Sequence, residues 1–136
     1  MKYLLIAMLL VWTGAAAAQA AGSGKDIREQ TPAELRQTAA ELEQALILKP
    51  TDVDLYVKLG FAYTRLGRAD DAQRAFESAA RLDPQRAIAH YMLGLIYEKK
   101  GLKDQAIASW KSCLETAKEQ HLKDTALKHI NNLSAN

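Results

Sequence analysis

The sequence contains a single cysteine, Cys113, so no disulfide can form within one chain and the fold must be held by packing. Proline and glycine are also scarce, with three and seven residues among 136. These two residues interrupt helices most strongly, whereas the abundant Ala, Leu, Lys, Glu and Gln favour them. The composition therefore predicts an all-α protein, and its length leaves room for one domain.

A surplus of charge of one sign is absent as well. The chain has 18 basic and 16 acidic residues, a net charge of +2, and no block of like charge. Binding to nucleic acid requires Lys and Arg gathered on one face, so this balance argues against a nucleic-acid partner.

The first twenty residues are typical of a signal peptide. Lys2 supplies a basic start, residues 4–12 are apolar, and Ala18 and Ala20 provide the small side chains of a cleavage site. We expect cleavage after Ala20 and a periplasmic or secreted protein. The alternative is a retained leader that anchors the chain in a membrane, although this apolar stretch is short for a span.

A shift of 34 residues aligns two stretches of the chain without gaps. The paired positions are Pro50 and Pro84, Leu59 and Leu93, Gly60 and Gly94, Tyr63 and Tyr97, Gly67 and Gly101, Ala72 and Ala106, Phe76 and Trp110, and Ala79 and Cys113. A period of 34 is typical of a helix–turn–helix unit that buries its apolar face only by stacking on its neighbours.

The pattern resembles the tetratricopeptide repeat family. The first copy fills the family's slots with Tyr56, Leu59, Gly60, Tyr63, Ala72, Phe76, Ala79 and Pro84. The second copy departs at His90, in the opening aromatic slot, and at Lys118, where proline is expected. The resemblance covers residues 52–118. It implies an all-α, right-handed superhelix of about six antiparallel helices.

Small residues occupy the positions where paired helices should cross. We expect Gly60 and Gly94 on the first helices of the two repeats, with Ala72 and Ala106 opposite them.

The helix ends carry recognisable signals. Thr31 and Glu34 can form a capping box, with Pro32 at the first helical position. Gly67 and Gly101 can close their helices in the left-handed conformation. The predicted organisation is a signal peptide (1–20), a flexible linker (21–30), a half-repeat helix (31–49), repeat one (52–84), repeat two (86–118) and a capping helix (123–134).

The two flanking helices differ from the full repeats. In the helix over 31–49, the second-helix slots hold Thr38, Leu42, Ala45 and Leu48. In the last helix Leu127 is in register with Leu59 and Leu93, but the slots of the aromatic, glycine and tyrosine hold Asp124, Lys128 and Asn131. A lysine in the close-crossing slot predicts a polar cap that ends the stack.

No catalytic or metal-binding constellation is apparent. His90, His121 and His129 lack the spacing of a helical zinc site, and no glycine-rich phosphate loop is present. Cys113 lies in an alanine slot, which favours a buried thiol over the alternative of a redox role. We therefore predict a protein that is not an enzyme, with no cofactor, metal or small-molecule substrate.

The resemblance also implies a concave surface formed by the first helix of each repeat. The positions that should face inward are Val57, Phe61, Thr64, Arg65, Ile88, Tyr91, Leu95, Glu98 and Lys99. Family members that bind a terminal carboxylate have Lys and Asn where this chain has Val57, Phe61 and Leu95, so that clamp is not expected. An apolar strip with basic residues at its edge predicts a partner helix or peptide with an apolar face.

These features predict a non-catalytic adaptor or assembly factor that binds a protein. Two alternatives remain: a structural module that self-associates into a homo-oligomer, and a membrane-anchored subunit if the leader is retained. The apolar strip could instead be covered by the linker over residues 21–30.

Overall fold

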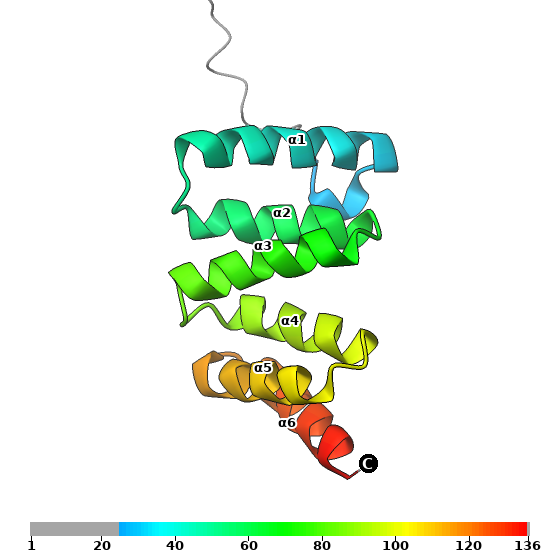
Figure 1. Ribbon diagram of the computed structural model, residues 1–136, viewed down its shortest axis with the longest axis vertical. Coiled ribbons are helices and arrows are strands. Elements are labelled where there is room, and N and C mark those ends of the chain that lie inside the picture. Colours follow the sequence, from blue (N-terminus) through cyan, green and yellow to red (C-terminus); the bar gives the residue numbers. More distant parts are fainter. Residues whose placement is uncertain (1–24, 136) are drawn as a thin grey trace, which may run out of the picture.

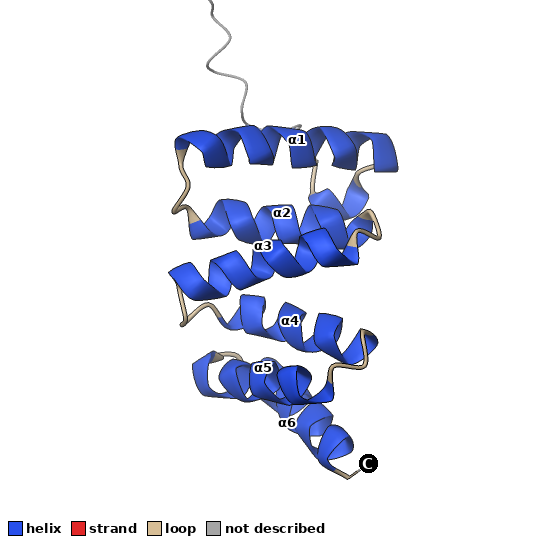
Figure 2. Ribbon diagram, in the orientation of Figure 1, coloured by secondary structure: helices blue, strands red, loops and turns tan. Residues whose placement is uncertain are grey.

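The computed structural model describes residues 25–135, which form six α-helices stacked in chain order (Figure 1). The helices are α1 (Pro32–Leu48), α2 (Val53–Arg65), α3 (Ala69–Leu82), α4 (Ala87–Lys99), α5 (Lys103–Thr116) and α6 (Gln120–Ser134). Each helix packs against the next one in the chain. Figure 2 shows only helices and short loops over these residues, which confirms the predicted all-α class. The predicted signal peptide and its cleavage site lie outside the described residues.

The helix ends follow local sequence signals. The Thr31 side chain accepts a hydrogen bond from the Glu34 backbone, and the Glu34 carboxylate accepts one from the Thr31 backbone, so the predicted capping box is present. Gly67 and Gly101 have φ angles of 71° and 72°, as the predicted left-handed ends require.

The core is one continuous cluster, with Phe76 and Trp110 fully buried at equivalent positions of the two repeats. A Cβ atom on Gly60 would lie 2.6 Å from Cζ of Phe76, and one on Gly94 would lie 2.6 Å from Cε2 of Trp110. The glycines therefore make room for the buried aromatic rings, and it is a ring rather than an alanine that approaches each of them most closely.

His90 takes over the role of the aromatic residue that the repeat normally has in its slot. In repeat one, the hydroxyl of Tyr56 donates to the carbonyl of Pro50 over 3.2 Å. In repeat two, Nε2 of His90 lies 2.8 Å from the carbonyl of Pro84. The equivalent proline carbonyl therefore has a side-chain hydrogen-bond partner in both repeats, which explains how a histidine fits this packing slot.

A second hydrogen bond recurs with the period of the repeat and joins neighbouring repeats. The hydroxyl of Tyr63 on α2 donates to Glu43 on α1. The hydroxyl of Tyr97 on α4 donates to Glu77 on α3 over 2.6 Å. Burial, followed by the adjacent Glu43 carboxylate, raises the pKa of Tyr63 to about 12. Burial likewise raises the pKa of Tyr97, so both phenols are neutral donors over the physiological pH range.

Helix α6 begins at Gln120, three residues before the predicted start of the capping helix. Leu127 is 44% exposed, whereas its counterparts Leu59 and Leu93 are buried. The difference arises because none of residues 25–135 forms a helix on that side of α6. The three polar residues in the aromatic, glycine and tyrosine slots are exposed on the same helix: Asp124, Lys128 and Asn131.

Candidate functional site

The predicted apolar strip lies along α2 and α4. We call it the inner strip, and it consists of Val57, Phe61, Tyr91 and Leu95. All four side chains are half-buried and pack against the core. Since the residues of α4 follow those of α2 by 34, the two helices present them on equivalent faces.

Ring contacts fix two members of the inner strip. The Phe61 ring meets Phe76 edge to face, with 5.4 Å between centroids. The Tyr91 ring meets Trp110 in the same way at 5.3 Å. These aromatic side chains are anchored on one side and are partly exposed on the other, a geometry suited to contact with a partner.

The remaining predicted residues have different surroundings. Thr64, Arg65 and Lys99 are exposed, and Ile88 is half-buried. The Thr64 hydroxyl donates to its own helix, at the carbonyl of Gly60, over 2.8 Å. Within residues 25–135, Lys99 makes no ion pair, so its ammonium group is available to a partner.

Glu98 was predicted to face a partner, but its carboxylate is engaged within the protein. Its Oε2 accepts from Nε1 of Trp110 over 3.1 Å and lies 2.7 Å from Nδ1 of His129. The His129 ring stacks on Trp110 with 4.3 Å between centroids. Glu98 therefore joins α4 to α5 and α6.

Residues 25–30, which we call the N-terminal segment, are folded against α1 and α2 and differ from the flexible linker predicted there. They contain a 3₁₀ turn, Ile27–Glu29, which the Asp26 side chain caps. Hydrogen bonds from Arg28 lower the pKa of Asp26 to about 2. Gln30 is only 4% exposed, donates to the carbonyl of Lys25 and accepts from Thr38 of α1.

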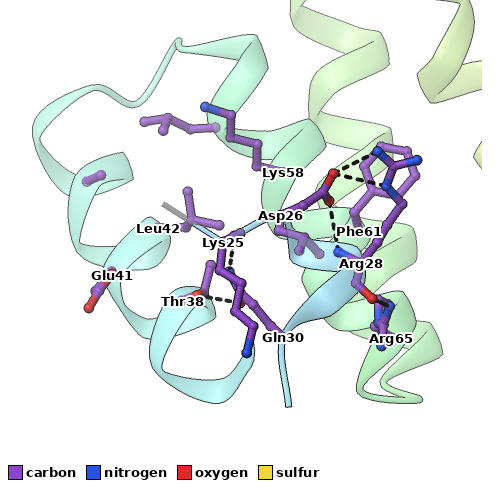
Figure 3. A pocket seen from close by; sticks show the side chains of 13 residues that line it. Lys25, Asp26, Arg28, Gln30, Thr38, Glu41, Leu42, Lys58, Phe61 and Arg65 are labelled. Carbon is purple, nitrogen blue, oxygen red and sulfur yellow. Dashed lines mark hydrogen bonds and ion pairs between the residues drawn. The ribbon is translucent and has the colours of Figure 1, made fainter. Parts of the chain in front are cut away.

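The N-terminal segment also reaches the predicted groove. The guanidinium of Arg65 donates to the carbonyl of Arg28, and Ile27 and Phe61 line one cavity (Figure 3). Residues of the predicted linker therefore lie beside the repeat-one end of the inner strip. The N-terminal segment thus covers the basic edge of the strip at Arg65, whereas the four residues of the inner strip stay partly exposed.

The cavity between α1, α2 and the N-terminal segment has a volume of about 820 Å³, and we call it the α1–α2 cavity. Figure 3 shows side chains of α1 and of α2 on either side of the segment. The lining residues are Lys25, Asp26, Ile27, Arg28, Gln30, Thr38, Glu41, Leu42, Ala45, Leu55, Lys58, Phe61 and Arg65. Lys58 is exposed and has no ion pair with any described residue.

Sequence reasoning missed this cavity and the role of Ile27. The available signal was the period itself, because Ile27, Phe61, Leu95 and His129 follow one another at intervals of 34 residues. Ile27 therefore stands where the two full repeats carry an inner-strip residue.

Other chemistry is not indicated in the described part of the chain. Residues 25–135 contain no group of three His, Cys, Asp or Glu residues placed to hold a metal ion. Cys113 is a free, buried thiol, as its alanine slot predicts, and burial raises its pKa. No helix within residues 25–135 has both the length and the apolar character needed to cross a membrane.

Comparisons with known proteins agree with the architecture. Residues 57–111 match the family model described as "Tetratricopeptide repeat". Among solved structures, PcrH in complex with the chaperone binding region of PopD is similar, with 15% identity and a TM-score of 0.69 over 76% of this chain and 80% of that one. MamA is similar with 23% identity and a TM-score of 0.56 over 75% of this chain and 68% of that one. These identities show a shared fold alone, and no curated protein matches in a sequence search.

Proposed function

Because the chain is a tetratricopeptide repeat protein, matched by the family model over residues 57–111, we propose that it is a non-catalytic protein-interaction module whose inner strip binds a segment of a partner protein. The main support is the inner strip itself, whose apolar side chains are anchored on the core and partly exposed. Exposed Lys99 lies one helical turn beyond Leu95, so a partner with an apolar face and a nearby carboxylate fits best.

The structural neighbours are consistent with a protein partner. The PcrH structure contains a segment of another protein, the chaperone binding region of PopD. A protein segment is therefore a ligand that this helical architecture can accept. By analogy, we propose a helix or an extended peptide as the bound form.

We further propose that the protein works in the periplasm or outside the cell, as an adaptor or assembly factor. The support is the leader sequence, with its basic start, apolar core and small residues before the expected cut after Ala20. N-terminal sequencing of the protein from its native host distinguishes this from a membrane-anchored subunit. A chain that begins at Ala21 supports export, whereas a chain that retains Met1 supports the anchor.

Site-specific photocrosslinking in the native host tests the binding surface. A photoreactive amino acid replaces Thr64 or Lys99, which are exposed beside the inner strip, and controls replace Arg81 or Lys111, which are exposed on α3 and α5. We expect one protein to crosslink from the first pair and not from the second. Equal crosslinking from all four positions, or none from the first pair, would contradict the proposal.

Self-association is a second candidate, and one observation favours it. Ile47 and Leu48, at the end of α1, are 70% and 84% exposed. Two adjacent apolar side chains on a surface can form the centre of a contact between copies. Light scattering on the wild type and on Ile47→Lys decides the matter: an oligomer that the substitution dissociates supports self-association, and a monomeric wild type excludes it.

A further inference from the structure

Helix α1 has an uncovered face where the other second helices are covered. The α3 residues Ala72, Ala75, Phe76 and Ala79 are buried, as are their counterparts on α5. The equivalent residues of α1 are Thr38, Glu41, Leu42 and Ala45, and all four are only half-buried. In the two full repeats the first helix of the same repeat packs on this face, whereas no described first helix precedes α1.

Helix α2 also has an uncovered face, on the side of the α1–α2 cavity. Lys58 is exposed, whereas its counterparts on the later first helices, Met92 and Ala126, are buried. Both uncovered faces line the α1–α2 cavity (Figure 3). The cavity is therefore the position that the first helix of an incomplete repeat would occupy.

The N-terminal segment fills only part of this position. Its 3₁₀ turn has three residues, whereas α2 and α4 each have thirteen. Ile27 provides one apolar side chain in the register of Phe61, and about 820 Å³ remains beside it. A helix could occupy the remaining space next to the turn.

The walls of the cavity limit the chemistry of such a helix. The apolar wall consists of Ile27, Leu42, Ala45, Leu55 and Phe61. The charged lining residues are four basic ones, Lys25, Arg28, Lys58 and Arg65, and two acidic ones, Asp26 and Glu41.

Only one of these basic groups lacks a partner of its own. Lys25 pairs with Glu34, Arg28 pairs with Asp26, and Arg65 donates to a backbone carbonyl. Lys58 has no partner among residues 25–135. A helix that covers Lys58 must supply a carboxylate, because an ammonium group buried without one is strongly disfavoured.

We propose that the α1–α2 cavity receives an amphipathic helix of a partner protein, with its apolar side toward Leu42 and Leu55 and an acidic side chain at Lys58. The helix completes the unfinished repeat by occupying the part of the first-helix position that the N-terminal segment leaves open. This inference rests on the proposed function, since it names a location and a chemistry for partner binding.

Two other occupants fit the cavity less well. A second copy would insert its terminal first helix, α6. Exposed Lys128 of that helix occupies the slot of Gly60 and Gly94. A lysine at this position would add positive charge to a cavity that is already basic. The residues between the expected cut and the N-terminal segment, 21–24, include Gly22 and Gly24, which disfavour a helix.

The test uses the full chain and two synthetic amphipathic peptides of thirteen residues, the length of α2 and α4. Both peptides have the same leucine stripe, but one has glutamates and the other lysines at its polar positions. Fluorescence anisotropy of the labelled peptides measures binding. We expect the acidic peptide to bind at least about tenfold more tightly than the basic one. Equal affinities, or no binding of the acidic peptide, would overturn the inference.

A charge reversal then tests the assigned contact. In Lys58→Glu we expect the preference to reverse, so that the basic peptide binds more tightly, while the matched control Lys111→Glu on α5 keeps the wild-type preference. Ala45→Trp should block both peptides by filling the cavity, whereas Ala40→Trp, exposed on the same helix, should not. Circular dichroism verifies that each variant is folded. Equal behaviour of a variant and its control would contradict the assignment.

A photoreactive amino acid in place of Glu41 identifies the occupant directly. Mass spectrometry of a crosslink to the acidic peptide supports the inference, whereas a crosslink to residues 1–24 of the same chain or to a second copy overturns it. The proposed function fails separately. A native partner that crosslinks from Lys99 and tolerates both Lys58→Glu and Ala45→Trp would preserve that function and refute the helix in the cavity.

Discussion

A methyl group added at Gly94 would have no room, because its Cβ atom would lie 2.6 Å from Cε2 and 2.7 Å from Cδ2 of Trp110. Restoring the optimal carbon–carbon separation of about 3.5 Å requires a movement of roughly 1 Å. The ring cannot move freely, since it is fully buried, stacks on His129 and donates to Glu98. We therefore expect Gly94→Ala to distort the contact between α4, α5 and α6.

Whether Gly94→Ala raises or lowers the free energy of unfolding distinguishes a steric clash from the usual preference of helices for alanine. In an unobstructed helix interior, replacing glycine by alanine stabilises the protein by about 1 kcal/mol. Overpacking a rigid core typically costs about 1–3 kcal/mol, and loss of the Trp110 hydrogen bond adds about 1 kcal/mol. The gain from alanine and the loss of the hydrogen bond offset each other, so we expect the free energy of unfolding to fall by about 1–3 kcal/mol in Gly94→Ala. Guanidinium unfolding followed by far-ultraviolet circular dichroism measures it.

Two further variants separate the clash from other effects. Gly101→Ala has nothing within 4 Å of the new Cβ atom but requires a φ angle of +72°, so it should cost about 1–2 kcal/mol through the backbone alone. In a Trp110→Leu background the clash disappears, and Gly94→Ala should then stabilise the protein by up to about 1 kcal/mol. A Gly94→Ala variant at least as stable as the wild type would refute the reasoning.

Further predictions concern four other sites. The pKa of Tyr63 is about 12 in the folded protein against 10.0 for a free phenol. The contribution of Tyr63 to stability is therefore complete below pH 10 and is lost as the pH rises through 12. The free energy of unfolding of Tyr63→Phe should fall less steeply than that of the wild type between pH 10 and pH 12. Native Cys113 should react with iodoacetamide far more slowly than the denatured chain, because the thiol is buried and its pKa is raised. His90→Leu should lower the free energy of unfolding by about 1 kcal/mol through loss of a hydrogen bond, and His90→Tyr should restore it. Removing the contact to Glu98 in His129→Ala should increase amide hydrogen exchange in α6 before the other helices.

Each of these expectations has a contradicting result. A pH dependence identical in Tyr63→Phe and the wild type would exclude the phenol as its source. Rapid labelling of native Cys113 would indicate an accessible thiol and revive the redox alternative. If His90→Leu and His90→Tyr are equally stable, the bond to the Pro84 carbonyl contributes nothing. Uniform exchange across all helices of His129→Ala would show that α6 is not held by this contact.

The helices and their ends could be predicted from the sequence because their signals are local. The capping box at Thr31 and the left-handed glycines, Gly67 and Gly101, depend on a few neighbouring residues and on the period of 34. The all-α class likewise follows from the period of 34, which is typical of helix–turn–helix units. Each such unit buries its apolar face by stacking on its neighbours.

The surroundings of the candidate site could not be predicted in the same way. Glu98 contacts His129 across 31 residues of sequence, in a capping helix whose slots depart from the family pattern. The folded N-terminal segment depends on Gln30 and Arg65, which meet α1 and a distant backbone carbonyl, respectively. Such contacts arise from tertiary packing, and no local sequence motif predicts them.

The recurring bond between tyrosine and glutamate has a consequence for how such a protein can grow. Each repeat carries the acceptor for the next repeat on its second helix and the donor for the previous repeat on its first helix. A duplicated 34-residue unit would therefore bring both halves of the junction with it, and the chain could lengthen without a new interface. At the last junction, Lys111 and Asn131 replace Glu77 and Tyr97. A unit inserted between α3 and α4 would therefore extend the array, whereas one inserted between α5 and α6 would meet Lys111 in place of the acceptor.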